Sequence, residues 1–137
     1  MTITEFQGPH RFLSNFWIEP DGTCVEVEYQ RIKTIEPEEW DRFKGVTPGQ
    51  AKRLGRTVTL RTDWGEVKIP SMRVLVKQKF LDHPNLAEQL KATGDAPLIE
   101  GNKWHDNFWG SCSCPQCLER QGHNWLGQIL MEVRESL

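Results

Sequence analysis

The sequence predicts a helix-rich α+β fold with short strands, formed by residues 1–137 as a single domain. Three observations support this fold class. The chain of 137 residues has ordinary domain length and contains no repeat or low-complexity linker. Residues 123–136 place Leu126, Leu130 and Val133 on one side, as in an amphipathic helix. Residues 2–6 and 16–19 are expected to form short strands.

Helix starts and stops are visible in the first half of the chain. In residues 36–40, Pro37 suits the first turn of a helix, and acidic neighbours favour its positive end. Thr47 is a good N-cap for a short helix that has Pro48 at its first position and Gly55 as terminator. Residues 58–60 are expected to be extended.

Two further helices are predicted in the second half. Apolar residues recur at helical spacing from Met72 to Leu81, and Pro70 suits the first turn of such a helix. Residues 85–93 place Leu86 and Leu90 at helical spacing and stop at Gly94.

Residues 25–33 fit two secondary structures. Apolar and acidic residues alternate from Val25 to Tyr29, which slightly favours a strand. As a helix, the same segment would carry Glu26, Gln30 and Lys33 on one face. The two outer Cα atoms would then lie about 10 Å apart, within reach of one sugar for long side chains.

Charge is unevenly distributed along the chain. The formal net charge is -2, which predicts neither a basic nucleic-acid binder nor an acidic tail. However, residues 52–79 hold only two acids and are rich in Lys and Arg. This stretch is either a solvated face with salt bridges or a patch that faces phosphates. The six Trp residues suit the core, or stacking on a planar ligand.

No membrane segment is expected. No apolar run approaches the roughly 20 residues that span a bilayer, and the N-terminus lacks the apolar stretch of a signal peptide. We therefore expect a soluble, cytoplasmic protein with reduced cysteines.

Three of the four cysteines crowd into six residues, a spacing that suits a metal better than disulfides. Three thiolates and one imidazole are enough for a tetrahedral structural zinc. The proposed ligands are Cys112, Cys114, Cys117 and His123, with Cys24 or His105 as alternatives to His123. The competing interpretation is a loop with free thiols.

A set of motifs in a fixed order runs through the whole chain. These motifs are Leu13-Ser14-Asn15-Phe16, residues 26–33, 51–56, 61–64, Lys79-Phe80, Ile99-Glu100, 106–110 and 124–134. Together they resemble the NADAR family, the YbiA-like N-glycosidases. The resemblance implies that residues 25–33 form a helix, which reverses the preference from periodicity.

The sequence departs from the family pattern at two places. Val27 stands where the family usually has a histidine after the glutamate, so any role of that imidazole is absent. Residues 111–117, which contain the clustered cysteines, replace the glycine-rich loop that normally follows the tryptophan-glycine pair.

The resemblance implies hydrolysis of an N-glycosidic bond between ribose and an exocyclic amine, without a catalytic cofactor. Substrates known for the family are riboflavin-pathway ribosylaminopyrimidines and ADP-ribose attached to guanine. Glu26 and Asp106 would be the carboxylates that stabilise positive charge on the ribose and move protons. Trp64 would stack on the base or ring. Lys33 would form a Schiff base with the opened sugar if its site is desolvated and its pKa lowered. Two carboxylates nearby would instead keep the amine charged, and cleavage would then proceed without a covalent intermediate.

Weaker candidates for substrate contacts are Ser14, Asn15, Arg56, Trp109, Gly110 and Asn124. Each site residue also has an ordinary structural alternative. Glu26 and Lys33 would be a solvated pair, Asp106 a turn residue, Trp64 and Trp109 core, and Arg56 a surface charge. Two other functions stay open: removal of ADP-ribose from nucleic acid, and binding of ADP-ribose without cleavage.

Overall fold

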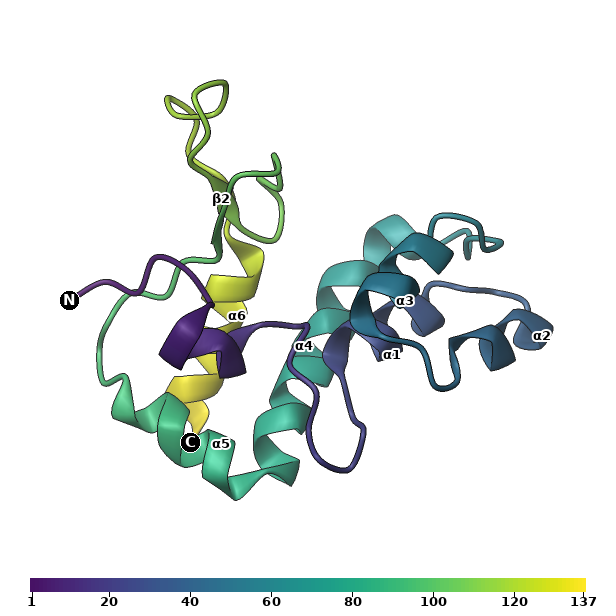
Figure 1. Cartoon of the computed structure of the whole chain (residues 1–137), viewed down its shortest axis with the longest axis horizontal. Helices are drawn as coiled ribbons and strands as arrows, with labels where there is room; N and C mark the ends of the chain where they lie inside the picture. The colour runs from purple at the N-terminus through teal and green to yellow at the C-terminus, as the bar shows by residue number, and fades with distance from the viewer. The chain divides into compact units, whose positions relative to one another are not determined.

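The computed structural model describes all residues from Met1 to Leu137. They divide into two compact units, which are described here one at a time. Unit 1 contains Met1–Ser14 and Val76–Leu137, and unit 2 contains Asn15–Leu75. The structure is helix-rich with one small sheet, which confirms the predicted α+β class (Figure 1). That residues 1–137 act as one domain stays a prediction.

Unit 2 is built from helices. It contains α1 (Val25–Ile32), α2 (Pro37–Trp40), the 3-10 helix η2 (Asp41–Phe43), α3 (Pro48–Leu54) and the first part of α4 (Trp64–Asp82). Thr47 caps α3 as predicted, in a capping box with Gln50, and the helix ends before Gly55. The expected strand at residues 16–19 is absent, and residues 58–60 take part only in a single antiparallel bridge between Thr34 and Leu60.

The alternation in residues 25–29 does not produce a strand, because the segment folds as α1. Val25, Glu26, Tyr29 and Gln30 are its buried residues, a spacing that follows the helical repeat. Within this buried face, Gln30 Nε2 donates a hydrogen bond to Glu26 Oε1 at 2.8 Å. Because two residues of the buried face are polar, hydrophobic periodicity does not identify this segment as a helix.

The predicted start of helix α4 was wrong. Helix α4 begins at Trp64, so Pro70 lies inside it and not at its first turn. The amide of Val67 already bonds the carbonyl of Asp63, which closes a helical turn before the proline is reached. Proline has no amide to donate to the carbonyl of Glu66, and Pro70 itself lies on an exposed side of the helix.

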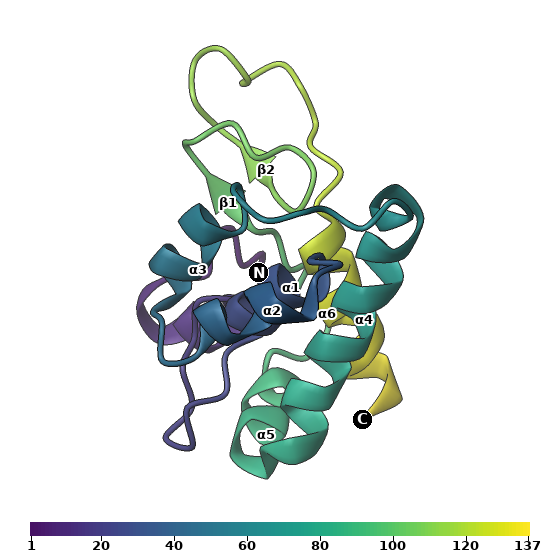
Figure 2. The ribbon, with the colours of Figure 1, turned by 90° about the vertical axis from the view of Figure 1, so that its right-hand side faces the viewer.

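Unit 1 holds the small sheet and the two C-terminal helices. It contains the 3-10 helix η1 (Gly8–Leu13), the end of α4, α5 (Pro84–Ala92), β1 (Gly101–Asn102), β2 (Ser111–Cys112) and α6 (Trp125–Ser136). Strands β1 and β2 are parallel, with Gly101 opposite Ser111 (Figure 2). In place of the strand expected at residues 2–6, only Ile3 forms a bridge, to Leu98.

The core of unit 1 is apolar, and the side chains of a lysine and an arginine donate hydrogen bonds at its edge. Its fully buried side chains include Phe80, Leu86, Leu90, Leu98, Ile129 and Leu130. Lys79 is also buried, and its ammonium donates to the carbonyls of Phe12 at 2.6 Å and Ser14 at 3.0 Å. Arg134 of α6 donates to the Thr93 hydroxyl and the Ala96 carbonyl beyond the end of α5. These bonds give the motif lysine and the closing arginine structural roles.

None of the helices is both long enough and apolar enough to cross a membrane.

Candidate functional site

One face of α1 gathers the first group of predicted site residues. Glu26, Gln30 and Lys33 fall at positions i, i+4 and i+7, so they line the same side of the helix and its C-terminal end. Glu26 is 7% exposed and Gln30 is 6% exposed, while Lys33 is half-buried. A solvated surface pair is therefore the wrong description of Glu26. A buried carboxylate beside an amine is the kind of group that takes part in proton transfer.

The amine of Lys33 has a perturbed acidity. Burial lowers the pKa of Lys33 below its ordinary value of 10.5, and the positive charge of Arg56 lowers it further. The negative charge of Glu26 raises the pKa of Lys33, but it does not cancel the effect of burial. More of the neutral amine is therefore present at a given pH than for a solvated lysine.

Gly55 is required by the close approach of α3 to this face. A Cβ atom at position 55 would overlap Gln30 Oε1 and would lie 2.9 Å from Lys33 Cε. Gly55 has an ordinary helical φ of -61°, so the space around it, and not its conformation, demands glycine. The Thr47 cap and Gly55 thus place α3 against Gln30 and Lys33, with Arg56 directly after the glycine.

Gln30 was placed on the same helical face as Glu26 and Lys33 from the sequence, but it was not selected as a site residue. Its Nε2 holds Glu26, whereas its Oε1 is buried without a hydrogen-bond partner. A buried acceptor without a partner costs about 1–3 kcal/mol. The signal that would have identified it is its position midway between Glu26 and Lys33 on one helical face.

The remaining candidates of unit 2 lie around the ends of α1 and α4. Trp64 is the first residue of α4 and is half-buried, with its ring centroid 5.1 Å from that of Tyr29. The Asn15 carbonyl accepts hydrogen bonds from the Glu26 amide and the Cys24 thiol. Asn15 also donates from Nδ2 to the sulfur of Met72. Asn15 therefore secures the start of α1.

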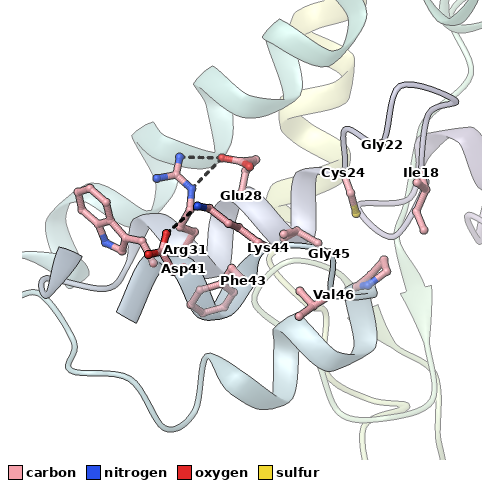
Figure 3. Close-up of a pocket in the computed structure, with 13 residues that line it drawn as sticks. Ile18, Gly22, Cys24, Glu28, Arg31, Asp41, Phe43, Lys44, Gly45 and Val46 are labelled. Atoms are coloured by element: carbon pink, nitrogen blue, oxygen red, sulfur yellow. Dashed lines mark hydrogen bonds and ion pairs between the residues drawn. The ribbon is translucent and has the colours of Figure 1, made fainter. Parts of the chain in front are cut away.

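A cavity of about 500 Å³ lies on the other side of α1 (Figure 3). Its wall includes Glu28 and Arg31 of α1 and Asp41 and Lys44. These charges are paired, Arg31 with Glu28 at 2.7 Å and Lys44 with Asp41 at 2.9 Å. Because Glu28 and Arg31 point away from the Glu26 face, this cavity is separate from the predicted catalytic residues.

The basic stretch of residues 52–79 is only partly available to a phosphate. Arg61 makes a two-bond ion pair with Asp63, at 2.7 and 3.0 Å, and Lys79 is buried against backbone carbonyls. Arg53, Arg56 and Lys77 are exposed.

Asp106 belongs to unit 1, where it organises the turn that precedes β2. Its Oδ1 accepts hydrogen bonds from the amides of Phe108 at 3.1 Å and Trp109 at 2.9 Å. Asn102 bonds the amide of Asp106 through Oδ1 and its carbonyl through Nδ2. The side chain thus has the turn role that was one of its two interpretations, and Oδ2 is left for a further partner. That Asp106 shares a hollow with Glu26 stays a prediction.

Four other candidates of unit 1 also have structural contacts. Asn124 has a left-handed backbone, with φ 53°, and its side chain accepts from the Glu100 amide and donates to the Leu98 carbonyl. Gly110 has no room for a Cβ, because that atom would overlap Glu100. The Trp109 ring meets Phe108 edge-on, with centroids 4.8 Å apart. The Ser14 carbonyl binds Lys79.

The clustered cysteines come together with a histidine. The Sγ atoms of Cys112, Cys114 and Cys117 and a ring nitrogen of His105 all lie within 4.8 Å of one another. His123, the preferred fourth ligand in the sequence analysis, is not part of this group, and the alternative His105 is. Spacing after the last cysteine favoured His123, whereas the fold of the loop brings His105 back beside the thiols.

The thiols have different acidities. Burial raises the pKa of Cys112, but hydrogen bonds from the Cys114 amide and thiol, from His105 and from Cys117 outweigh burial and lower that pKa to about 7. Burial is also the main cause at Cys117, and there it raises the pKa. All four cysteines of the chain are free of disulfides.

Comparison with known proteins identifies relatives over the whole chain. Residues 5–137 match the family model described as NADAR domain. The NMR structure of Escherichia coli YbiA superposes with a TM-score of 0.79 and 33% identity, over 98% of this chain and 84% of that one. N-glycosidase YbiA of E. coli strain K12 is 35% identical over 133 residues, which cover 90% of this chain and 79% of the relative.

Two other relatives are longer proteins. A riboflavin biosynthesis protein of Vibrio vulnificus is 38% identical over 93% of this chain but only 36% of its own length. An N-glycosidase of Nostoc punctiforme is 45% identical over 67% of this chain and 56% of its own length. The chain thus spans about a third to a half of these two relatives.

Proposed function

Since the chain belongs to the NADAR domain family, we propose that it is an N-glycosidase that cleaves the bond between ribose and an exocyclic amine of a base. The observation that carries this proposal is the buried Glu26 on the same face of α1 as Lys33, whose pKa is lowered by burial. Burial of Glu26 and the lowered pKa of Lys33 are both typical of groups that take part in proton transfer or nucleophilic attack. Relatives named N-glycosidase support the same activity.

Glu26 and Asp106 are the proposed acid and base. Departure of the base leaves positive charge on the ribose ring, and a carboxylate nearby stabilises that charge. One carboxyl group protonates the departing nitrogen, and the other accepts a proton from the attacking water. Gln30 holds Glu26 in place through its 2.8 Å hydrogen bond, and it acts as a positioning residue.

Lys33 is the proposed nucleophile. A ribosylamine opens to an imine between C1 and the base nitrogen, and the neutral amine of Lys33 adds to C1. The C1–N bond to the base then breaks, the base leaves as a free amine, and Lys33 is joined to the sugar as a Schiff base. One water hydrolyses this bond, which releases the sugar and restores the lysine. The lowered pKa of Lys33 favours the neutral amine that this route needs.

The substrate is proposed to bind through three further contacts. The unpaired Oε1 of Gln30 accepts a hydrogen bond from a ribose hydroxyl. Arg56, which is exposed and near enough to Lys33 to lower its pKa, binds a phosphate of the substrate. Trp64 stacks against the base. Trp109 and Gly110 stay weaker candidates, and the hydrogen bonds of Asn124 leave it a structural role.

A small ribosylaminopyrimidine is the preferred substrate, because the Vibrio vulnificus relative is named as a riboflavin biosynthesis protein. The alternative is ADP-ribose on a guanine of nucleic acid, for which exposed Arg53, Arg56 and Lys77 would contact the backbone. Pairing of Arg61 with Asp63 and burial of Lys79 reduce the charge available for that role.

The test is incubation with both substrates, with release of free base followed by mass spectrometry. We expect turnover by the unmodified protein and loss of turnover in Glu26→Gln, with Glu28→Gln as a matched control from the other side of α1. Equal turnover by Glu26→Gln would contradict the proposal. If that variant binds ADP-ribose as tightly as the unmodified protein and neither cleaves any substrate, the chain is a binding module.

A second test addresses Lys33. Borohydride added during turnover reduces a Schiff base to a stable amine, so the protein mass should increase by that of the reduced sugar. The adduct should map to Lys33 and should be absent from Lys33→Ala. Normal turnover without any adduct would contradict the covalent route but would leave hydrolysis by the two carboxylates in place.

A further inference from the structure

We propose that His105, Cys112, Cys114 and Cys117 bind a structural Zn²⁺ ion, which fixes the loop that carries Asp106. The site itself does not depend on the proposed glycosidase activity. Only the consequence for Asp106 depends on it.

The distances between the ligand atoms suit a tetrahedral zinc. With Zn–S near 2.3 Å and Zn–N near 2.05 Å, the sulfur and nitrogen corners of a regular tetrahedron are about 3.5 Å apart. The His105 Nδ1 atom lies 3.3 Å from the sulfurs of Cys114 and Cys117 and 3.9 Å from that of Cys112. The three distances bracket the ideal value. Three thiolates and one imidazole also form a ligand set that strongly prefers zinc over harder cations.

Apart from the three cysteines, the loop between β1 and α6 buries no side chain. Among residues 103–124, the buried side chains are those of Cys112, Cys114 and Cys117, which form a small cluster of their own. Large apolar residues of the same loop, such as Trp104 and Leu118, are 55% and 69% exposed. Figures 1 and 2 show this segment as long connections beyond β2. A loop without an apolar core is commonly stabilised by a metal.

His105 adopts a backbone conformation that calls for a compensating interaction. Its φ is 69°, in the left-handed region, which is unfavourable for a residue with a Cβ. This conformation directs Nδ1 toward the three sulfurs although the residue itself is exposed. A metal bond to the ring offsets the cost.

Hydrogen bonds around the sulfurs complete the site. Asn107 donates from Nδ2 to Cys117 Sγ at 3.5 Å, and its Oδ1 accepts from the Cys112 amide at 2.9 Å. The Cys114 amide donates to Cys112 Sγ at 3.4 Å. Amide donors of this kind stabilise metal-bound thiolates and orient them.

Asp106 lies between the ligand His105 and the supporting Asn107. The metal would therefore hold both neighbours of this carboxylate. The amides of Phe108 and Trp109 bond Asp106 Oδ1 within the same segment. Loss of the metal is thus expected to displace Asp106 and leave α1 unchanged.

The experiment measures the metal in the full chain, prepared without a histidine tag in zinc-supplemented medium. We expect one zinc per chain by elemental mass spectrometry, and Co²⁺ substitution should give the intense visible bands of tetrahedral cobalt thiolate. Cys114→Ser and Cys117→Ser should lose the metal, whereas Cys24→Ser and His123→Gln should keep it. Asn107→Ala should bind zinc about 10–100-fold more weakly.

A ligand swap separates coordination from folding. His105→Gln should bind zinc more weakly, and His105→Cys should restore tight binding with a cobalt spectrum shifted toward that of four thiolates. Protein with less than a tenth of an equivalent of zinc, or Cys114→Ser with full zinc content, would overturn the proposal. If zinc is present but its removal leaves turnover unchanged, the metal site stands and the link to Asp106 is refuted.

Discussion

The side-chain amide of Gln30 joins two roles, because its nitrogen donates to Glu26 Oε1 at 2.8 Å while its oxygen is buried without a partner. Gln30→Leu should therefore remove the support of Glu26 and one acceptor for the substrate. Because a misplacement of about 1 Å costs roughly 10²-fold in rate, we expect kcat/KM to fall by about that factor. Steady-state kinetics with Gln78→Leu, an exposed glutamine of α4, as control will show whether the effect is specific.

Titration of Lys33 should give the pH profile of activity an ascending limb. The neutral amine is the reactive form, so activity should rise with pH and level off above the pKa of Lys33. Since burial and Arg56 lower that pKa, the midpoint is expected below 10.5.

Arg56→Gln tests the direction of this effect. Removal of the positive charge should raise the pKa of Lys33, move the limb to higher pH and reduce activity at neutral pH. Loss of substrate phosphate binding would instead raise KM at every pH, so kcat profiles of both proteins distinguish the two effects. An unchanged limb would argue against Lys33 as the titrating group.

Gly55→Ala should damage the site more than the fold. The added Cβ would overlap Gln30 Oε1, so the ends of two flexible side chains must move. We expect the free energy of unfolding to decrease by about 1 kcal/mol and kcat to fall by a larger fraction. Gly49→Ala in the same helix is the control, because its Cβ would meet only Arg53 at 3.8 Å. That change should slightly raise the melting temperature.

Asp106→Asn separates the two functions of that side chain. Asparagine keeps an oxygen for the amides of Phe108 and Trp109, so the melting temperature should change little. The proton-transfer group is lost, and turnover should fall by about 10²–10⁴-fold. Asp106→Ala should lose both functions and lower the melting temperature as well. Full activity in Asp106→Asn would remove this residue from the mechanism.

Capping residues and apolar spacing along the sequence predicted some of the helices correctly. Thr47 and Gly55 bounded α3 correctly, and the apolar spacing of Leu126, Leu130 and Val133 identified α6. The start of α4 was missed, because proline is tolerated inside a helix whose preceding turn has already closed. Helix α1 was ambiguous, because Glu26 and Gln30 are polar residues on its buried face, where a hydrophobic repeat would have apolar ones.

For the site, the sequence identified residue types better than partners. The cysteine spacing indicated a metal, but the choice between His105 and His123 depended on the backbone at His105, whose positive φ no short motif encodes. Likewise, the pKa of Lys33 depends on burial against α3, which is remote in sequence from the motif that contains the lysine.

The composition of unit 1 from two distant segments has a consequence for synthesis on the ribosome. Ile3 forms a bridge with Leu98, and the carbonyls of Phe12 and Ser14 accept hydrogen bonds from the ammonium of Lys79. The first 14 residues therefore leave the exit tunnel long before their partners are translated, while residues 15–75 form a continuous stretch that can begin to fold earlier. We expect the segment around Ile3 to join last, so that slow closure of this long-range contact limits the folding rate.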